Sequence, residues 1–211
     1  PIAMSTQIES YFSINREYGP EEIKEKGSRF ISYLFPVNKK EDAESIIKKI
    51  KKTCHDATHI CFAYCLGRGK EEYYRYNDDG EPPGTAGLPI YKEIKKRKYF
   101  NLMLVVIRYY GGIKLGKGGL IKAYGKSSKK VLDIVKKITV IVKNKISLSA
   151  PYDFTGEIMQ IIHYFNLNII QQKYSPEGIF LQFEAPISKV GEIKKRFVGF
   201  GKGKIKLDIT R

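Results

Sequence analysis

The residues best suited to chemistry lie in a glycine-rich segment at residues 108–120. Backbone N–H groups of glycines can approach an anion closely, and the amino end of a following helix adds about half a positive charge. Basic side chains among aromatic ones also suit single-stranded or irregular nucleic acid, because bases stack on rings while phosphates meet cations. The alternative is a packing corner, in which glycines let a helix lie close to a strand. The candidate anion-binding or nucleic-acid-binding residues are Arg108, Tyr109, Tyr110, Gly111, Gly112, Lys114, Gly116, Lys117, Gly118 and Gly119.

Two nucleotide-binding patterns fit this segment only in part. Residues 111–117 match G-x-x-x-x-G-K, the first part of the phosphate-binding loop of NTPases. Gly118 follows where such a loop carries the Ser or Thr that holds Mg²⁺, and Ile121 stands where G-x-G-x-x-G needs its last glycine. We therefore expect an anion-binding loop rather than an NTPase site.

A second candidate segment, residues 77–87, holds three carboxylates, two prolines and three glycines. Proline fixes φ and glycine permits positive φ, so the segment is expected to follow a specific path. Its acids could hold Mg²⁺ through oxygen ligands or pair with lysine and arginine, and the alternative is an Asp-Gly turn with solvated acids. The residues singled out here, together with one histidine that precedes them, are His59, Asp78, Asp79, Gly80, Glu81, Gly84, Thr85 and Gly87.

Cysteine and histidine also cluster at residues 54–65, but the spacing disfavours zinc. No C-x-x-C occurs, and Cys61 and Cys65 would lie ~13 Å apart along a strand, too far to share one ion. A Cys–His nucleophile pair would lack a third, orienting group. His59, at a strand edge near the acidic segment, is the better functional candidate, and His163 on an apolar helix is expected to pack.

Composition narrows the classes of partner. The 211 residues carry a net charge of +16, with +11 in residues 1–137 and +5 in residues 138–211. Such a surface attracts polyanions, although thirty lysines against eight arginines could also reflect a lysine-biased genome. Because the chain has only three cysteines, we expect no disulfide framework, and we expect the protein to reside in the reducing cytoplasm. The longest strictly apolar run, residues 102–107, is far shorter than the ~20 residues of a membrane span, so no membrane association is expected.

The last 74 residues have the clearest element pattern. Residues 138–149 predict a strand, and Asp153 offers a cap for a helix with apolar residues at 158, 161, 162 and 165. Alternating patterns predict strands around residues 167–169, 179–183 and 205–209, with a short helix after Pro186. The order β-α-β-β-α-β predicts a ferredoxin-like domain at residues 138–211.

Residues 1–137 predict a second unit of mixed structure. We expect a strand at residues 28–37, a helix capped by Asn38, a strand pair at residues 58–67 and 71–76, and a short helix at residues 88–98. A central strand buried on both faces is expected at residues 100–109, because residues 102–107 are continuously apolar. A helix follows the glycine-rich segment and runs through Val135. This unit is expected to be α/β or α+β.

Three segments, residues 59–64, 78–87 and 106–120, together resemble the signature of the IMPACT family, in its bacterial YigZ-like branch. The resemblance spans residues 27–130. It implies an α+β chain whose N-terminal domain has the fold of domain 2 of ribosomal protein S5 and domain IV of elongation factor G. It also implies a C-terminal domain similar to domain V of that factor. Eukaryotic relatives act in translational control through an additional N-terminal domain, and that role is not expected to transfer because little sequence precedes Gly27.

These observations favour a cytoplasmic RNA- or ribosome-associated protein that modulates translation and binds phosphate through the basic glycine-rich segment. One alternative is a Mg²⁺-dependent enzyme acting on a phosphorylated small molecule or nucleotide, with Asp78, Asp79 and Glu81 as metal ligands. Another is a protein-interaction module that presents the acidic segment to a protein partner. The sequence assigns no catalytic residue, metal site, cofactor or oligomeric state.

Overall fold

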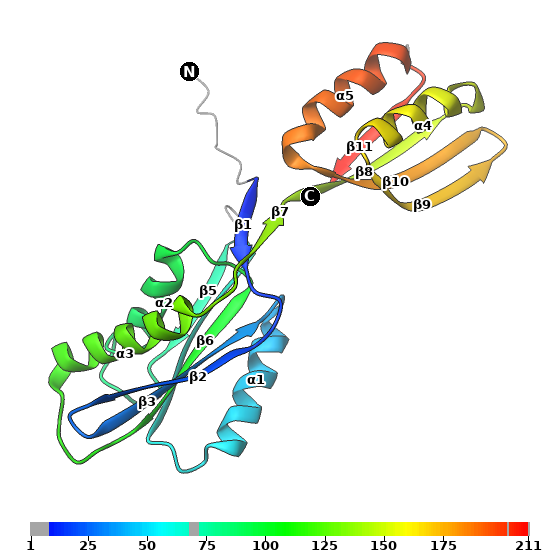
Figure 1. Ribbon diagram of the computed structural model, residues 1–211. Helices are drawn as coiled ribbons and strands as arrows, with labels where there is room; N and C mark the ends of the chain where they lie inside the picture. Colours follow the sequence, from blue (N-terminus) through cyan, green and yellow to red (C-terminus); the bar gives the residue numbers. More distant parts are fainter. Residues whose placement is uncertain (1–8, 68–71, 202, 211) are drawn as a thin grey trace. The chain divides into compact units, whose positions relative to one another are not determined.

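The computed structural model describes residues 9–67, 72–201 and 203–210, and it has an α+β architecture (Figure 1). The chain forms two compact units, Pro1–Val140 and Ile141–Arg211. The sequence placed this boundary after Lys137, three residues earlier. No described helix is both long and apolar enough to cross a membrane.

A five-stranded antiparallel sheet forms the centre of the first unit, with strand order β2-β3-β6-β4-β5. The strands are β2 (Tyr18–Glu25), β3 (Ser28–Pro36), β4 (His59–Leu66), β5 (Tyr73–Asn77) and β6 (Leu102–Tyr109). Residues 102–107 of β6 are at most 2% exposed, which confirms the prediction of a central strand buried on both faces. The predicted partner of β4 is present as β5, although Glu71, its predicted first residue, lies outside the described residues.

Helices cover both faces of this sheet. The helix α1 (Lys40–Thr53) packs on one face, while α2 (Gly87–Lys96) and α3 (Gly116–Asp133) pack together on the other (Figure 1). The prediction that Asn38 caps the first helix is wrong. The helix begins at Lys40, and the capping side chain belongs to its third residue, Asp42. The Asp42 carboxylate accepts the backbone N–H groups of Asn38 and Lys39.

The strand predicted at residues 138–149 is two strands. β7 (Ile138–Ile141) pairs with β1 (Ser10–Ser13) in a two-stranded sheet, whereas β8 (Lys143–Ala150) pairs with β10 and β11. Between them Val142 is 1% exposed, and its carbonyl oxygen accepts the N–H of Ile187. The β-branched run looks continuous in sequence, but its two halves have different pairing partners.

The second unit contains the predicted order of elements. After β8 come a 3₁₀ turn (Tyr152–Phe154), α4 (Thr155–Tyr164), β9 (Asn168–Ser175), β10 (Gly178–Pro186), α5 (Ile187–Gly201) and β11 (Lys206–Thr210). The sheet order is β11-β8-β10-β9, and α4 and α5 pack on it around Leu181, Phe183 and Phe197. Asp153 does not cap α4, because it lies inside the 3₁₀ turn and the helix begins two residues later without a side-chain cap.

Candidate functional site

The glycine-rich segment lies over a cleft of about 460 Å³ at the end of the first unit's sheet. Three segments that are far apart in the sequence meet there: the start of β4, the acidic loop at residues 77–87, and the stretch from the end of β6 to the first turn of α3. We call it the glycine-loop cleft. The side chains that define it are His59, Glu81, Arg108, Tyr110, Lys114 and Lys117.

A buried ion pair forms one wall of this cleft. Arg108 Nη1 lies 2.6 Å from Glu81 Oε1, and the two side chains are only 7% and 3% exposed. The Tyr124 hydroxyl, from α3, donates to the same carboxylate oxygen at 2.8 Å. Arg108 Nη2 also lies 3.4 Å from Ser28 Oγ on β3. The positive charge of Arg108 is therefore balanced inside the protein, and it joins β6, the acidic loop, α3 and β3.

Two aromatic rings lie close to the same guanidinium. Its carbon lies 5.5 Å from the ring centroid of Phe30 and 5.5 Å from that of Tyr110. Arg108 Nε has no hydrogen-bond partner in the described part of the chain. Tyr110 is 46% exposed and lines the cleft, whereas Tyr109 points to the α1 face, where its hydroxyl lies 3.4 Å from Asp56.

His59 lies directly opposite Arg108 in the pairing of β4 with β6. Its Nδ1 is 2.8 Å from the backbone carbonyl oxygen of Asp79. A carbonyl only accepts, so Nδ1 carries a proton and donates it. Its Nε2 lies 3.9 Å from Glu81 Oε2. The ring is thus fixed by the acidic loop while its second nitrogen faces the buried carboxylate.

The three carboxylates of the acidic loop have three different partners. Asp78 accepts the backbone N–H groups of three loop residues at 2.8–2.9 Å, which are those of Gly84, Ala86 and Gly87. Asp79 accepts the N–H of Ile60 and pairs with Lys51 at 3.0 Å, outside the glycine-loop cleft. Glu81 pairs with Arg108. Among the described residues no three His, Cys, Asp or Glu side chains are spaced to hold a metal ion, so these acids do not form the ligand set that the Mg²⁺ alternative needs.

The remaining residues of the acidic loop fix its path. Gly80 and Gly84 have φ of +89° and +76°, and Thr85 Oγ1 donates to the carbonyl of Pro82 at 2.7 Å. A Cβ on Gly87 would lie 2.7 Å from the backbone nitrogen of Asn77. The loop is therefore a rigid structure that places Glu81 against Arg108.

The glycines of the glycine-rich segment differ in their surroundings, and only some of them lie in a packing corner. A Cβ on Gly111 would lie 1.9 Å from the carbonyl carbon of Gly27, so this glycine belongs to a packing corner. Gly112 and Gly116 have φ of +86° and +71° with nothing near their Cβ positions, and Gly118 is equally open. A Cβ on Gly119 would meet Leu115 Cβ at 2.9 Å. From Gly112 to Gly118 the segment is exposed to solvent apart from the half-buried Leu115, while Gly119 is half-buried and Leu120 is buried.

The start of α3 carries the cations that are free to meet a ligand. Its N-cap is Leu115, no side chain caps the helix, and its first turn holds no acid. Lys114 and Lys117 are exposed, line the cleft, and form no ion pair with any described residue. Uncapped N–H groups beside two cations suit an anion such as a phosphate group.

Two residues that sequence analysis did not select prove important for the site. The first is Tyr124, which donates a hydrogen bond to Glu81 from the buried face of α3. Ser28 Oγ lies within hydrogen-bond distance of both Arg108 Nη2 and the Gly111 N–H. A tyrosine at an inward-facing position of the helix was the available signal for the first, and no pattern marked the second.

The cysteines of β4 are not poised for chemistry. Cys61 Sγ lies 3.3 Å from the Tyr124 hydroxyl and 3.1 Å from the Asp78 carbonyl oxygen, and burial raises the pKa of its thiol far above the usual range. Burial likewise raises the pKa of Cys65 to about 12. Because the thiolate is the nucleophile, neither cysteine can form the Cys–His pair considered from the sequence.

Comparison with known proteins identifies the segment that carries this cleft. The Impact N-terminal domain family matches residues 26–132. IMPACT family member YvyE of Bacillus subtilis is 43% identical over 151 residues, which cover 72% of this chain and 69% of that protein. IMPACT family member YigZ of Escherichia coli is 31% identical and covers 89% of this chain and 91% of that protein. The crystal structure of a hypothetical protein, 28% identical, superposes with a TM-score of 0.69 and covers 95% of this chain and 97% of that one.

The packing of Gly111 against Gly27 predicts a sharp contrast between two glycines of one segment. Gly111→Ala should lower the free energy of unfolding by about 3 kcal/mol or more, because a methyl group collides with backbone that cannot withdraw. Gly118→Ala, in the first turn of α3 with open space around it, should change stability by less than about 1 kcal/mol. Urea denaturation measures both; equal effects would show that the close approach does not exist in solution.

The buried ion pair predicts that Glu81→Gln is costly. Removing one partner leaves the Arg108 charge buried without compensation, which should cost about 3–5 kcal/mol. Glu93→Gln is the matched control, because Arg97 keeps Asp133 as a partner, and it should cost under about 1 kcal/mol. A tolerated Glu81→Gln in the same denaturation assay would contradict the buried pair.

The raised pKa values of Cys61 and Cys65 predict that these thiols resist alkylation at pH 8. At that pH a thiol whose pKa is about 12 is thiolate in only about one molecule in ten thousand. Iodoacetamide should therefore modify the half-buried Cys54 in the native protein and all three cysteines only after denaturation. Peptide mapping by mass spectrometry identifies the modified residue, and rapid native labelling of Cys61 would refute this environment.

Proposed function

The chain belongs to the IMPACT family, and from that premise we propose that it is a cytoplasmic RNA- or ribosome-associated protein that modulates translation. In this proposal the ligand group is a phosphate of the RNA backbone. It binds in the glycine-loop cleft, between Lys114, Lys117 and the uncapped amino end of α3.

One observation carries the proposal: the exposed cations of the cleft have no acidic partner among the described residues, while its buried cation does. Arg108 is neutralised by Glu81, so it shapes the cleft without attracting an external anion strongly. Lys114 and Lys117 are not neutralised by any described acid, and they lie beside backbone N–H groups of α3 that no side chain caps. A phosphate would supply the acceptor oxygens that these groups lack.

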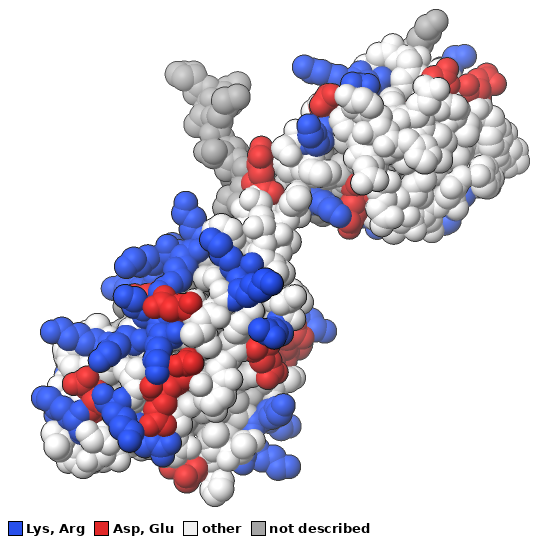
Figure 2. All heavy atoms as spheres, in the orientation of Figure 1, with Lys and Arg blue, Asp and Glu red and all other residues white. Residues whose placement is uncertain are grey.

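The charge distribution of the first unit supports a polyanion rather than a single small anion. Lysine and arginine side chains gather over α2 and α3 on the face drawn in Figure 2, with only scattered acids among them. Exposed lysines continue along α3 from the cleft at positions 122, 126 and 129, whereas Lys130 is paired with Glu21. A line of cations beyond one phosphate site is what a nucleic-acid backbone can use.

The fold of each unit is consistent with the same proposal. We assign the second unit to the ferredoxin-like fold, because its β-α-β-β-α-β order and β11-β8-β10-β9 sheet are those of the split βαβ arrangement. For the first unit we retain the relation to domain 2 of ribosomal protein S5 and domain IV of elongation factor G. Fold analogy alone is a weak argument for function, so the proposal depends on the cleft.

The Mg²⁺-dependent enzyme has less support, because Asp78 and Asp79 are engaged by backbone N–H groups and by Lys51. The protein-interaction module makes a different prediction from RNA binding. Capture of a protein partner by that module would survive nuclease and high salt, whereas an association through RNA phosphates would not.

The test is the salt dependence of RNA binding in a variant of the cleft. Lys114→Glu with Lys117→Glu should weaken binding of single-stranded RNA and reduce the slope of log K against log salt by about 1.4, because two phosphate contacts are lost. Filter-binding titrations at several salt concentrations measure this slope, and cosedimentation with ribosomal subunits tests the ribosomal partner.

A matched control variant distinguishes the loss of a specific binding site from a general loss of positive charge. Lys48→Glu with Lys52→Glu changes the net charge by the same amount on α1, on the opposite face of the sheet. This variant should keep the wild-type slope. Equal slopes for the two variants would mean that RNA contacts no particular part of this unit, and the assignment of the cleft would fail.

A further inference from the structure

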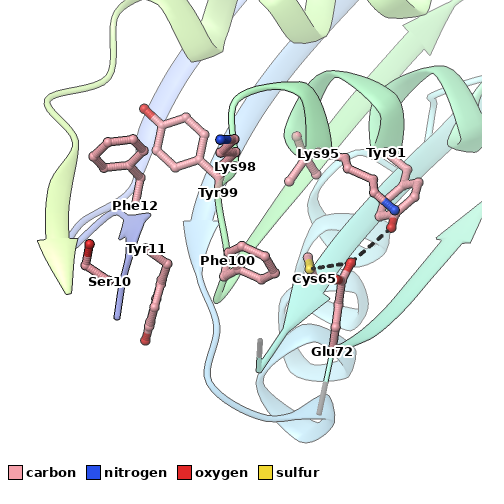
Figure 3. Close-up of a pocket in the computed structure, with 11 residues that line it drawn as sticks. Ser10, Tyr11, Phe12, Cys65, Glu72, Tyr91, Lys95, Lys98, Tyr99 and Phe100 are labelled. Carbon is pink, nitrogen blue, oxygen red and sulfur yellow. Dashed lines mark hydrogen bonds between the residues drawn. The ribbon is translucent and has the colours of Figure 1, made fainter. Parts of the chain in front are cut away.

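A second cleft, of about 470 Å³, lies at the opposite end of β4 on the same face of the sheet (Figure 3). It forms between β1, the end of α2 and the residues that follow α2. Cys65 contributes to it, whereas His59 contributes to the glycine-loop cleft, so the two sites are separated by about 20 Å along the strand. We call it the aromatic cleft, and it is distinct from the proposed phosphate site.

Four aromatic rings line one side of the aromatic cleft: Tyr11, Phe12, Tyr99 and Phe100 (Figure 3). They form two edge-to-face pairs, with ring centroids 5.8 Å apart for Tyr11 and Phe100 and 6.4 Å apart for Phe12 and Tyr99. Asn101 Nδ2 donates to the Tyr11 hydroxyl at 2.9 Å. Rings fixed in this way offer preorganised surfaces on which a flat ligand can stack.

The other side of the aromatic cleft is polar. Glu72 Oε1 accepts the Tyr91 hydroxyl at 3.2 Å and lies 3.9 Å from Cys65 Sγ (Figure 3). Burial raises the pKa of both Tyr91 and Cys65, so both remain protonated donors. Both interactions use one carboxylate oxygen, and the described part of the chain offers Oε2 no donor. An N–H group of a ligand would satisfy it.

Two lysines at the end of α2 give the aromatic cleft a positive rim. Lys95 Nζ lies 5.7 Å from the ring centroid of Tyr91, and Lys98 lies beside Tyr99 (Figure 3). Both are exposed, and neither forms an ion pair with a described residue. The cleft therefore combines aromatic walls with one acceptor oxygen and two cations that have no partner among the described residues.

We infer that the aromatic cleft binds a nucleotide unit, that is, a nucleobase that carries an amino group together with a phosphate. The base stacks against the aromatic rings, its amino group donates to Glu72 Oε2, and its phosphate meets Lys95 and Lys98. The volume falls within the ~300–1,000 Å³ that small-molecule sites usually have. Adenine, cytosine and guanine carry an exocyclic amino group. Uracil presents carbonyl oxygens on either side of its N–H, and these repel a carboxylate.

The experiment is a titration of the full chain with AMP and with UMP, followed through the isoleucine methyl resonances. Ile94 is buried and lines the aromatic cleft, while Ile60 packs on the opposite face of the sheet. AMP should shift the Ile94 methyl saturably and leave that of Ile60 in place, and UMP should bind more weakly. Failure of AMP, CMP and GMP alike to shift Ile94 at millimolar concentration would overturn the inference.

Variants separate this cleft from the glycine-loop cleft. Lys95→Gln with Lys98→Gln removes two exposed cations and should raise the Kd for AMP about tenfold. Lys114→Glu with Lys117→Glu should leave that Kd unchanged, and a reversed pattern would place the phosphate at the other site and refute the inference. Glu72→Gln should abolish the preference for AMP over UMP, and a preference that persists would exclude Glu72 as the acceptor.

A second arm distinguishes the source of the nucleotide. If the ligand is the end of an RNA chain, a short oligoadenylate should bind the aromatic cleft more tightly than AMP, because neighbouring phosphates add contacts. If it is a free mononucleotide, AMP should bind at least as tightly. Either result supports the inference and identifies the source of the nucleotide. In both cases the Ile94 methyl resonance must shift, and this shift must be lost in the variant that carries Lys95→Gln and Lys98→Gln.

Discussion

The first unit is organised around one buried charge that must be neutralised. Arg108 occupies the central strand of the sheet, where an isolated guanidinium would be strongly destabilising. The residues opposite it on the neighbouring strands are Phe30 and His59, and its partner Glu81 comes from the acidic loop. The need to neutralise Arg108 explains the loop's rigid construction, with Asp78 binding three backbone N–H groups. The same carboxylate accepts the Tyr124 hydroxyl and so ties α3 to the loop.

The glycine-loop cleft follows from this arrangement through a division of roles among its cations. Arg108, being buried and paired, fixes the distances between β6, the acidic loop and α3. Lys114 and Lys117 extend from the exposed part of the same segment and remain available. The glycines divide in the same way, since Gly111 has no space for a side chain while Gly112 and Gly118 face open solvent. A single stretch of sequence thus contains an anchored half and an accessible half.

Local patterns in the sequence predicted the elements well, and failed where a contact between distant residues decides the outcome. The central strand β6 and the alternating strands of the second unit follow directly from hydrophobic periodicity. The break at Val142 does not, because β7 and β8 differ only in the strands they pair with. The candidate site residues were selected from the sequence by chemical type and local spacing. Which of them meet depends on the register that places His59 opposite Arg108, and no spacing rule contains that register.

The net charge of the chain says little about where ligands bind until each cation is matched with its partners. Several basic residues are already paired, as Lys51 is with Asp79, Lys130 with Glu21 and Arg97 with both Glu93 and Asp133. Such pairs contribute to the surface field but gain little from an external anion. Both clefts, by contrast, carry two lysines that no described acid neutralises. Because they lie at opposite ends of one strand, on the face of the sheet that α2 and α3 cover, we infer that this face of the first unit is the one that meets phosphate.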